Sequence, residues 1–145
     1  AVLAHEIGHY KRGHVPKRLA LSALFGLVGF WFIGFLTQAE WFYEHLGFDV
    51  SGAGAGPMGP VLLVMAVASG VFTFWLGPIG NMLSRRHEYE ADAFAKEAVG
   101  GPDSLVSALR KMYVENLSNP LPHPVFACVY HSHPTLPERE GALRK

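Results

Sequence analysis

The stretch His5-Glu6-Ile7-Gly8-His9, close to the start of the chain, has the pattern H-E-x-x-H. On an α-helix, residues four positions apart lie on one face, one turn apart, so His5 and His9 can both offer an imidazole nitrogen to one metal ion. Glu6 lies one step around the helix, where its carboxylate can take a proton from an activated water instead of binding the metal. The pattern therefore predicts a helix that carries two metal ligands and a general base.

The residues around this pattern favour a helix, with one exception. Ala4, Ile7 and Lys11 all tolerate or favour helical structure, whereas Gly8 costs up to about 1 kcal/mol relative to alanine. A glycine inside a helical pattern often marks a position that another part of the chain approaches closely. We therefore expect a close packing contact at Gly8.

Two long apolar runs dominate the composition of the chain. Of the 145 residues, 50% are hydrophobic and only 17% are charged, which is unusual for a soluble domain. Residues 19–39 and 50–84 contain no Asp, Glu, Lys or Arg. Each run exceeds the ~20 residues that a helix needs to cross a bilayer. We predict two membrane spans, at residues 19–39 and 61–83, in preference to two buried helices of a soluble core, because the first run is apolar all round.

The charges that flank these runs predict the orientation of the spans. Basic residues cluster before the first span and after the second, as cytoplasmic flanks do: Lys11, Arg12, Lys17, Arg18, Arg85 and Arg86. Residues 40–60 contain acidic residues but no Lys or Arg, so we expect an outside loop there. Both ends of the chain, with the metal site, should then lie on the cytoplasmic side. His14, five residues after His9 and off its helix face, is expected to be a solvated residue of the basic flank and not a third ligand.

Other features narrow the expected partners. The net charge is zero and no basic stripe alternates with aromatic residues, so nucleic acid is not an expected partner, whereas a lipid bilayer is. The glycine-rich stretch 51–60 lacks the Gly-Lys-Ser/Thr ending of a phosphate-binding loop, and a flexible turn is expected there. The chain has no initiator Met and opens inside a predicted helix, which indicates a part of a larger membrane protein.

A third metal ligand is expected after the second span, where residues 84–97 have a helical composition. A zinc peptidase keeps three protein ligands and one open position. Glu88 can supply the third ligand, with Asp92, on the same helix face, hydrogen-bonded to a ligand imidazole. Spacing alone leaves Glu90 open. Glu88 is preferred because its partner four residues on is Asp92, whereas that of Glu90 is Phe94, which accepts no hydrogen bond.

Local signals also predict helix starts in the C-terminal part of the chain. Asp103 is a candidate N-cap for one helix. Thr135 and Glu138 have the spacing of a capping box, which places His133 in the turn before a last helix.

Three blocks of the sequence, residues 3–14, 84–95 and 131–139, together resemble the type I CAAX prenyl protease family. Its members are integral-membrane zinc metalloendopeptidases of the gluzincin kind. The blocks, which contain His5-Glu6-Ile7-Gly8-His9, the Glu88 and Asp92 pair, and His131-Ser132-His133-Pro134, stand in family order across nearly the whole chain.

The resemblance implies roles for individual residues. One Zn²⁺ ion would be bound by His5, His9 and Glu88. Glu6 would be the catalytic base. Asp92 would form a hydrogen bond to the imidazole of a metal ligand without binding the metal itself. His133 would steady the tetrahedral intermediate. In this sequence Val129-Tyr130-His131 stands where the family often has an aromatic pair before the serine of this block. The departure falls on residues that the family uses in the wall of its substrate site.

The resemblance also implies an all-α, membrane-embedded peptidase. A single domain fragment, residues 1–145, would consist of these segments: 1–18 (zinc-binding helix and basic flank), 19–39 and 61–83 (spans), 40–60 (outside loop) and 84–145 (third-ligand helix and helical C-terminal part). The family surrounds its site with a ring of membrane helices, whereas this chain has two spans.

The implied activity is hydrolysis of peptide bonds in a peptide or protein substrate. The family acts on prenylated CAAX proteins at their C-termini. A bacterial protease for the quality control of membrane proteins is an alternative, because related stress proteases share H-E-x-x-H and the E-x-x-x-D pair. A non-catalytic metal-binding membrane protein is an alternative of another class, although such a protein has no need of Glu6.

Overall fold

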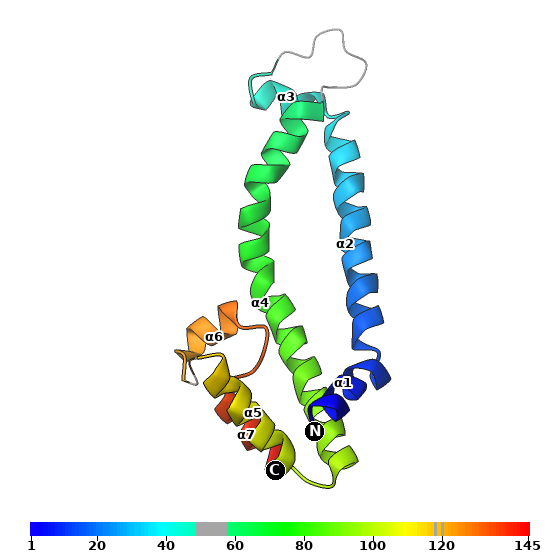
Figure 1. The fold of residues 1–145 in the computed structure, drawn as a ribbon. Coiled ribbons are helices and arrows are strands. Elements are labelled where there is room, and N and C mark those ends of the chain that lie inside the picture. The colour runs from blue at the N-terminus through cyan, green and yellow to red at the C-terminus, as the bar shows by residue number, and fades with distance from the viewer. Residues whose placement is uncertain (49–57, 118, 120) are drawn as a thin grey trace. The chain divides into compact units, whose positions relative to one another are not determined.

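Helices account for all the regular structure in the described residues, which are 1–48, 58–117, 119 and 121–145 of a computed structural model (Figure 1). In chain order they are α1 (Val2–Lys11), α2 (His14–Leu36), α3 (Glu40–His45), α4 (Met58–Val99), α5 (Asp103–Glu115), α6 (Pro124–Tyr130) and α7 (Leu136–Leu143). The predicted all-α class is confirmed. The turn expected at 51–60 falls mostly outside the described residues, and its last three residues belong to α4.

Glycines with positive φ angles end two of these helices. Gly13 has φ +65° and donates its N–H to the Tyr10 carbonyl at 3.1 Å, so α1 stops and α2 starts in a new direction. Gly100 has φ +78° at the end of α4, and Gly101 donates to the Lys96 carbonyl at 3.0 Å. These turns decide where the side chains just beyond α1 and α4 can lie.

The starts of α5 and α7 differ in how well the sequence predicted them. The capping box of α7 is confirmed, with the Thr135 N–H donating to Glu138 Oε2 at 2.7 Å. We had predicted Asp103 as the N-cap of α5, and this prediction is wrong. Pro102 occupies the N-cap position, and no side chain caps the helix there. Asp103 lies in the first turn instead, where its negative charge suits the positive end of the helix.

The chain divides into two compact units, which are described separately. One unit comprises residues 18–74, and the other comprises residues 1–17 together with 75–145. Helices α2 and α4 each contribute residues to both units.

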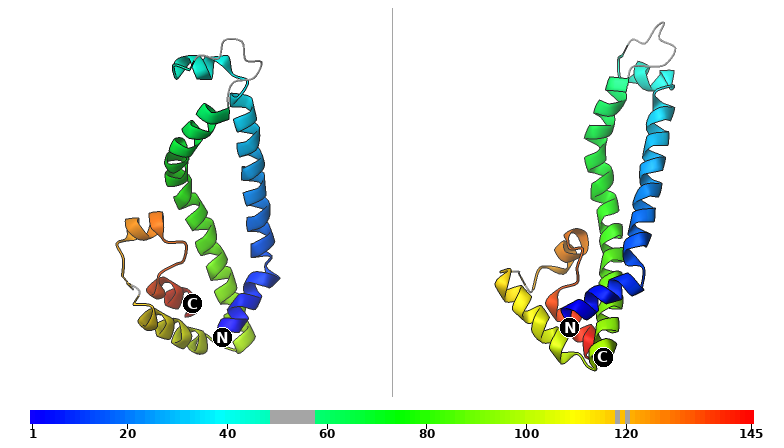
Figure 2. Two further views of the ribbon diagram at one scale, coloured as in Figure 1. Left: turned by 45° about the horizontal axis from the view of Figure 1, so that its top comes forward. Right: turned by 45° about the vertical axis from the view of Figure 1, so that its right-hand side comes forward.

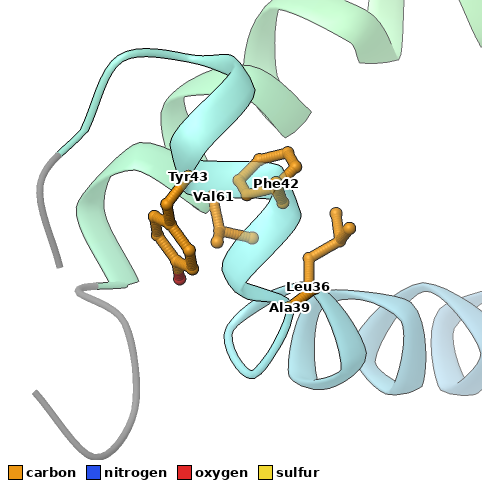
Figure 3. Close-up of a cluster of buried hydrophobic side chains, with 5 residues drawn as sticks. All are labelled: Leu36, Ala39, Phe42, Tyr43 and Val61. Atoms are coloured by element: carbon orange, nitrogen blue, oxygen red, sulfur yellow. The ribbon is translucent and has the colours of Figure 1, made fainter. Parts of the chain in front are cut away.

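In the unit of residues 18–74, a small apolar cluster ties α3 to the ends of α2 and α4 (Figure 3). Its buried members are Leu36, Ala39, Phe42, Tyr43 and Val61. The Tyr43 hydroxyl donates to the Thr37 carbonyl at 3.4 Å. Six residues of the predicted outside loop 40–60 therefore form helix α3, whereas residues 49–57 lie outside the described residues.

Helices α2 and α4 are both long and apolar enough to cross a membrane. Only 6% and 0% of their most apolar 18-residue windows are buried, whereas a core helix of a soluble protein would be mostly buried. The predicted span 61–83 lies within α4, and the predicted span 19–39 lies within α2 except for residues 37–39, which follow the end of that helix. The third-ligand segment is not a separate helix, because α4 continues through Pro78 as far as Val99.

The unit of residues 1–17 and 75–145 brings α1 against the C-terminal part of α4, which α1 crosses in both views of Figure 2. Gly8 faces Ala91 of α4 at the crossing, so the close contact expected at this glycine is confirmed. Helices α4, α5 and α7 share a core of Ala95, Leu105, Val106, Leu109 and Leu143. This core holds α4 and α7 beside the predicted metal ligands of α1.

Candidate metal centre

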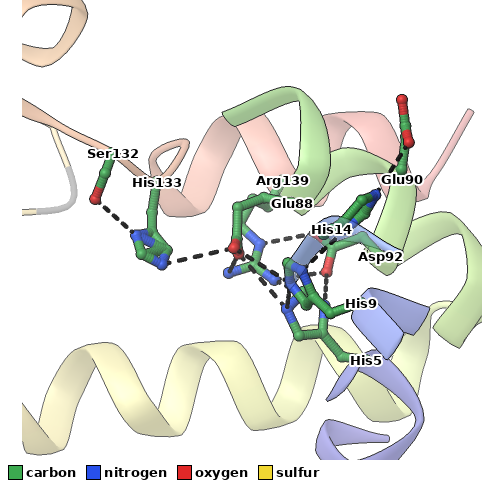
Figure 4. A network of polar contacts seen from close by, with 9 residues as sticks. All are labelled: His5, His9, His14, Glu88, Glu90, Asp92, Ser132, His133 and Arg139. Atoms are coloured by element: carbon green, nitrogen blue, oxygen red, sulfur yellow. Dashed lines mark hydrogen bonds and ion pairs between the residues drawn. The ribbon is translucent and has the colours of Figure 1, made fainter. Parts of the chain in front are cut away.

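Helix α1 turns both of its predicted ligands toward α4, where Glu88 faces them (Figure 4). The Nε2 atoms of His5 and His9 are 3.1 Å apart. Glu88 Oε2 lies 3.6 Å from His5 Nε2, and Glu88 Oε1 lies 3.4 Å from His9 Nε2. The structure thus brings together three side chains from two helices that are about 80 residues apart in the sequence.

The spacing of these atoms suits one four-coordinate metal ion. Ligand atoms about 2.0–2.1 Å from a tetrahedral ion stand about 3.3 Å from each other, from simple geometry. The separation of 3.1 Å between the two histidine nitrogens is close to that value. The two Glu88 distances, 3.4 and 3.6 Å, run to different carboxylate oxygens, and one ligand atom from each of the three residues lies within 4.8 Å of the others. Two imidazoles and a carboxylate are ligands that zinc prefers, whereas magnesium and calcium prefer sites made only of oxygen atoms.

Asp92 contacts the ring nitrogen Nδ1 of His5, the first predicted ligand. Its Oδ1 atom lies 2.8 Å from His5 Nδ1, and its side chain is almost fully buried. An Nδ1–H that donates to this carboxylate leaves the lone pair of Nε2 free for a metal, and it fixes the direction of the ring. The contact that the sequence predicted between Asp92 and one of the two histidines of α1 is therefore present at His5, whereas the role of His5 as a metal ligand stays a prediction.

Arg139 of α7 contacts both Asp92 and Glu88 of α4. The sequence did not predict this role for Arg139. Its Nε donates to Asp92 Oδ2 at 2.7 Å, and its Nη2 donates to Asp92 Oδ1 at 2.5 Å. Its Nη1 lies 3.4 Å from Glu88 Oε2. A signal was available, because two acids that become buried on one helix face require a cation, but the sequence does not say which one.

The charges of this cluster support one another. Burial by itself lowers the pKa of His5, but hydrogen bonds with Asp92 and Glu88 raise it to about 9. Burial alone would raise the pKa values of Glu88 and Asp92. Hydrogen bonds with His5 and the positive charge of Arg139 outweigh burial and lower both values. The two carboxylates are thereby held ionised.

His14 differs from the expectation of a solvated flank residue. It is the first residue of α2, and only 1% of its surface is exposed. Its Nδ1 lies 3.0 Å from His9 Nδ1, and its Nε2 lies 3.2 Å from Glu90 Oε2. Its ring stacks on that of His87, with 4.1 Å between the centroids. The turn at Gly13 folds His14 back over α1, which helix periodicity alone did not reveal.

The two predicted catalytic residues line one cavity of about 630 Å³. Glu6 and His133 both contribute to its wall, as do the three residues that converge on one another: His5, His9 and Glu88. His133 Nε2 lies 3.6 Å from Glu88 Oε1, and 62% of the His133 side chain is exposed. Ser132 Oγ lies 3.1 Å from His133 Nδ1 and can hold the ring. The cavity therefore has a carboxylate and an imidazole, both accessible, beside the three predicted ligands.

Comparisons with known proteins extend over the whole chain. The family model of peptidase family M48 matches residues 1–145. CAAX prenyl protease 1 of Saccharomyces cerevisiae is 32% identical over 99% of this chain and 34% of its own length. The CAAX prenyl protease 1 homolog of Homo sapiens is 34% identical over 99% of this chain and 30% of its own length.

A solved structure agrees with these relatives. The crystal structure of S. mikatae Ste24p matches with a TM-score of 0.81 and 29% sequence identity, covering 99% of this chain and 36% of that one. The chain thus spans about a third of the length of the proteins it matches. These findings confirm the resemblance noted from the three sequence blocks, and the chain belongs to peptidase family M48.

Proposed function

We propose that this chain carries the catalytic centre of a membrane-bound zinc metalloendopeptidase. The observation that carries the proposal is the convergence of His5, His9 and Glu88 on one point of a cavity that also contains Glu6. Membership of a peptidase family supports the same chemistry. A site that only stores or binds metal would not need a free carboxylate at the position of Glu6.

Each residue has a distinct task in the proposed reaction. When bound, zinc would act as a Lewis acid toward the scissile carbonyl and the attacking water. Glu6 takes a proton from that water and passes it to the nitrogen of the leaving amine. His133 donates a hydrogen bond from Nε2 to the carbonyl oxygen as negative charge develops there. Asp92 keeps the ring of His5 in place throughout.

The proposed substrate is a prenylated protein with a C-terminal CAAX sequence. The relatives named CAAX prenyl protease 1, which match nearly all of this chain, favour that substrate class over membrane-protein quality control. The cavity is also lined by three exposed apolar side chains, Val2, Val15 and Met112, which suit an extended, largely apolar peptide.

The proposed setting is a bilayer with the metal centre on the cytoplasmic side. The basic residues before the apolar part of α2 and after the apolar part of α4 favour that side, because positively charged flanks remain cytoplasmic. The exposed apolar faces of α2 and α4 would contact lipid or other membrane helices.

The test uses the purified full-length protein in detergent with one equivalent of zinc. We expect it to cleave a farnesylated CAAX peptide, to lose that activity on dialysis against a chelator, and to regain it when zinc is returned. A matched peptide without the prenyl group tests the substrate class. Zinc binding without cleavage of either peptide would favour the non-catalytic alternative. Equal cleavage of both peptides would leave a peptidase but overturn the CAAX assignment.

A further inference from the structure

The second ligand histidine has an outer partner that the proposed mechanism does not use. His5 is held by Asp92, whereas His9 contacts His14 through Nδ1 on the side away from Glu88 (Figure 4). His14 in turn reaches Glu90, which lies on α4 two residues after Glu88 and two residues before Asp92. The two ligand imidazoles therefore have different hydrogen-bond partners, a carboxylate for His5 and a third imidazole for His9.

We propose that His14 and Glu90 form a hydrogen-bond relay that positions His9 for metal binding. The inference rests on the proposed function, in which His9 binds zinc through Nε2. In a neutral His9 that uses Nε2 as a ligand, the ring proton is on Nδ1. That N–H points to His14 Nδ1 at 3.0 Å, so His14 Nδ1 must accept the hydrogen bond.

The remaining contacts agree with that assignment of protons. A neutral His14 that accepts at Nδ1 carries its own proton on Nε2, and Nε2 lies 3.2 Å from Glu90 Oε2. A carboxylate only accepts hydrogen bonds, so Glu90 selects the tautomer of His14 that His9 requires. The Arg86 Nε donates to the other oxygen of Glu90 at 2.9 Å and holds the carboxylate in place.

His14 is itself firmly held. Its side chain is 2% exposed, and its ring stacks on His87 at an interplanar angle of 10°. Both of its ring nitrogens are engaged, one by His9 and one by Glu90. These contacts place His14 behind His9 and not among the groups that converge on the metal position. His14 is thus a positioning residue, and its effect passes through His9.

Two substitutions of His14 separate hydrogen bonding from packing. His14→Phe keeps an aromatic ring that can stack on His87 but removes both hydrogen bonds. His14→Asn loses the stacking ring, but its Oδ1 stands close to the position of Nδ1 and can accept from His9. If the hydrogen bond to His9 matters, His14→Phe should weaken zinc binding and His14→Asn should largely keep it. If packing matters, the order is reversed.

The measurement is the zinc dissociation constant of the full-length protein in detergent, by competition with a chromophoric chelator. We expect His14→Phe to weaken zinc binding by roughly 10 to 100-fold, the usual effect of losing an outer partner of a ligand. His14→Asn should remain within a few-fold of the wild type. Glu90→Ala should weaken binding by itself but add nothing to His14→Phe, because the relay is already broken. His45→Phe, at an exposed histidine of α3, is the control and should bind as the wild type does.

The same series distinguishes failure of the inference from failure of the proposed function. His14→Phe that binds zinc as tightly as the wild type, or His14→Asn that binds no better than His14→Phe, would overturn the relay. Zinc binding that His9→Phe leaves unchanged would overturn the metal site, and the relay with it. Helical content and melting temperature, measured on each variant, show that a loss of binding does not come from unfolding.

Discussion

Gly8 of α1 lies directly against Ala91 of α4. A Cβ atom on Gly8 would stand 3.0 Å from the Ala91 carbonyl oxygen, 3.1 Å from the Ala91 Cα and 3.2 Å from a ring carbon of Phe94. Two of these three atoms are backbone, which cannot turn aside as the end of a side chain can. The absence of a side chain at Gly8 therefore sets how closely the histidines of α1 approach Glu88.

Gly8→Ala should therefore push α1 away from α4. Overpacking of about 1–3 kcal/mol opposes a gain of about 1 kcal/mol in helix propensity, so we expect a net loss of up to about 2 kcal/mol. Zinc affinity should fall as well, because His5 and His9 move with α1. Melting temperature and zinc content of the full-length protein measure both effects. Gly141→Ala in α7, where a Cβ would meet no neighbour within 4 Å, is the matched control and should be neutral or stabilising.

Glu6→Gln should keep the metal and lose turnover. The amide cannot take a proton from water, and loss of a general base commonly costs about 10²–10⁴-fold in rate. Zinc content and peptide cleavage are measured on the same preparation. Glu44→Gln, at an exposed glutamate of α3, should have no effect. Near-normal cleavage by Glu6→Gln would show that another group is the base.

Glu88→Ala should largely abolish zinc retention, because it removes one of the three proposed protein ligands. Asp92→Ala should weaken metal affinity or activity by roughly 10 to 100-fold, because it frees the ring of His5 without removing a ligand. Glu90→Ala should be the mildest of the three, since Glu90 contacts His14 and no ligand directly. Metal analysis of the purified variants checks this order. A metal-free Glu90→Ala beside a zinc-loaded Glu88→Ala would reverse the assignment of the ligand.

Arg139→Met should destabilise the unit that contains the metal centre by about 3–5 kcal/mol, because it leaves buried carboxylates without their cation. Arg139 is only 7% exposed, and Asp92, its closest partner, is 2% exposed. Arg144→Met provides the control, since the Arg144 side chain is 54% exposed and its contact with the exposed Asp103 is 3.8 Å long. That change should stay within about 0.5 kcal/mol. Thermal unfolding of the two variants measures the difference. Similar melting temperatures for Arg139→Met and Arg144→Met would contradict the proposed role of Arg139.

The orientation in the membrane can be tested with single cysteines. Cys128 is exposed and must first be replaced by serine. An impermeant thiol reagent added from outside should then label Glu44→Cys but not Lys17→Cys, because basic flanks remain cytoplasmic. If the reagent labels Lys17→Cys and not Glu44→Cys, the orientation in the membrane is the reverse of the one proposed.

The sequence alone determined the features that depend on neighbours along the chain. Helix periodicity places His5 and His9 on one face, and the same rule pairs Glu88 with Asp92. The length of the charge-free runs indicated two membrane helices, and the spacing of Thr135 and Glu138 indicated the start of α7. Each of these inferences needs only local geometry or composition, so none depended on knowing the fold.

Only the tertiary structure decided which side chains meet from distant parts of the chain. The turn at Gly13 buries His14 against His9, although its place in a basic flank indicated a solvated residue. The packing of α7 brings Arg139 to Asp92, 47 residues away. Such contacts depend on how helices pack over one another, and a hydrophobic or charged pattern within one helix does not specify its partner. The contacts behind the proposed metal ligands therefore became visible only once α1, α4 and α7 were packed together.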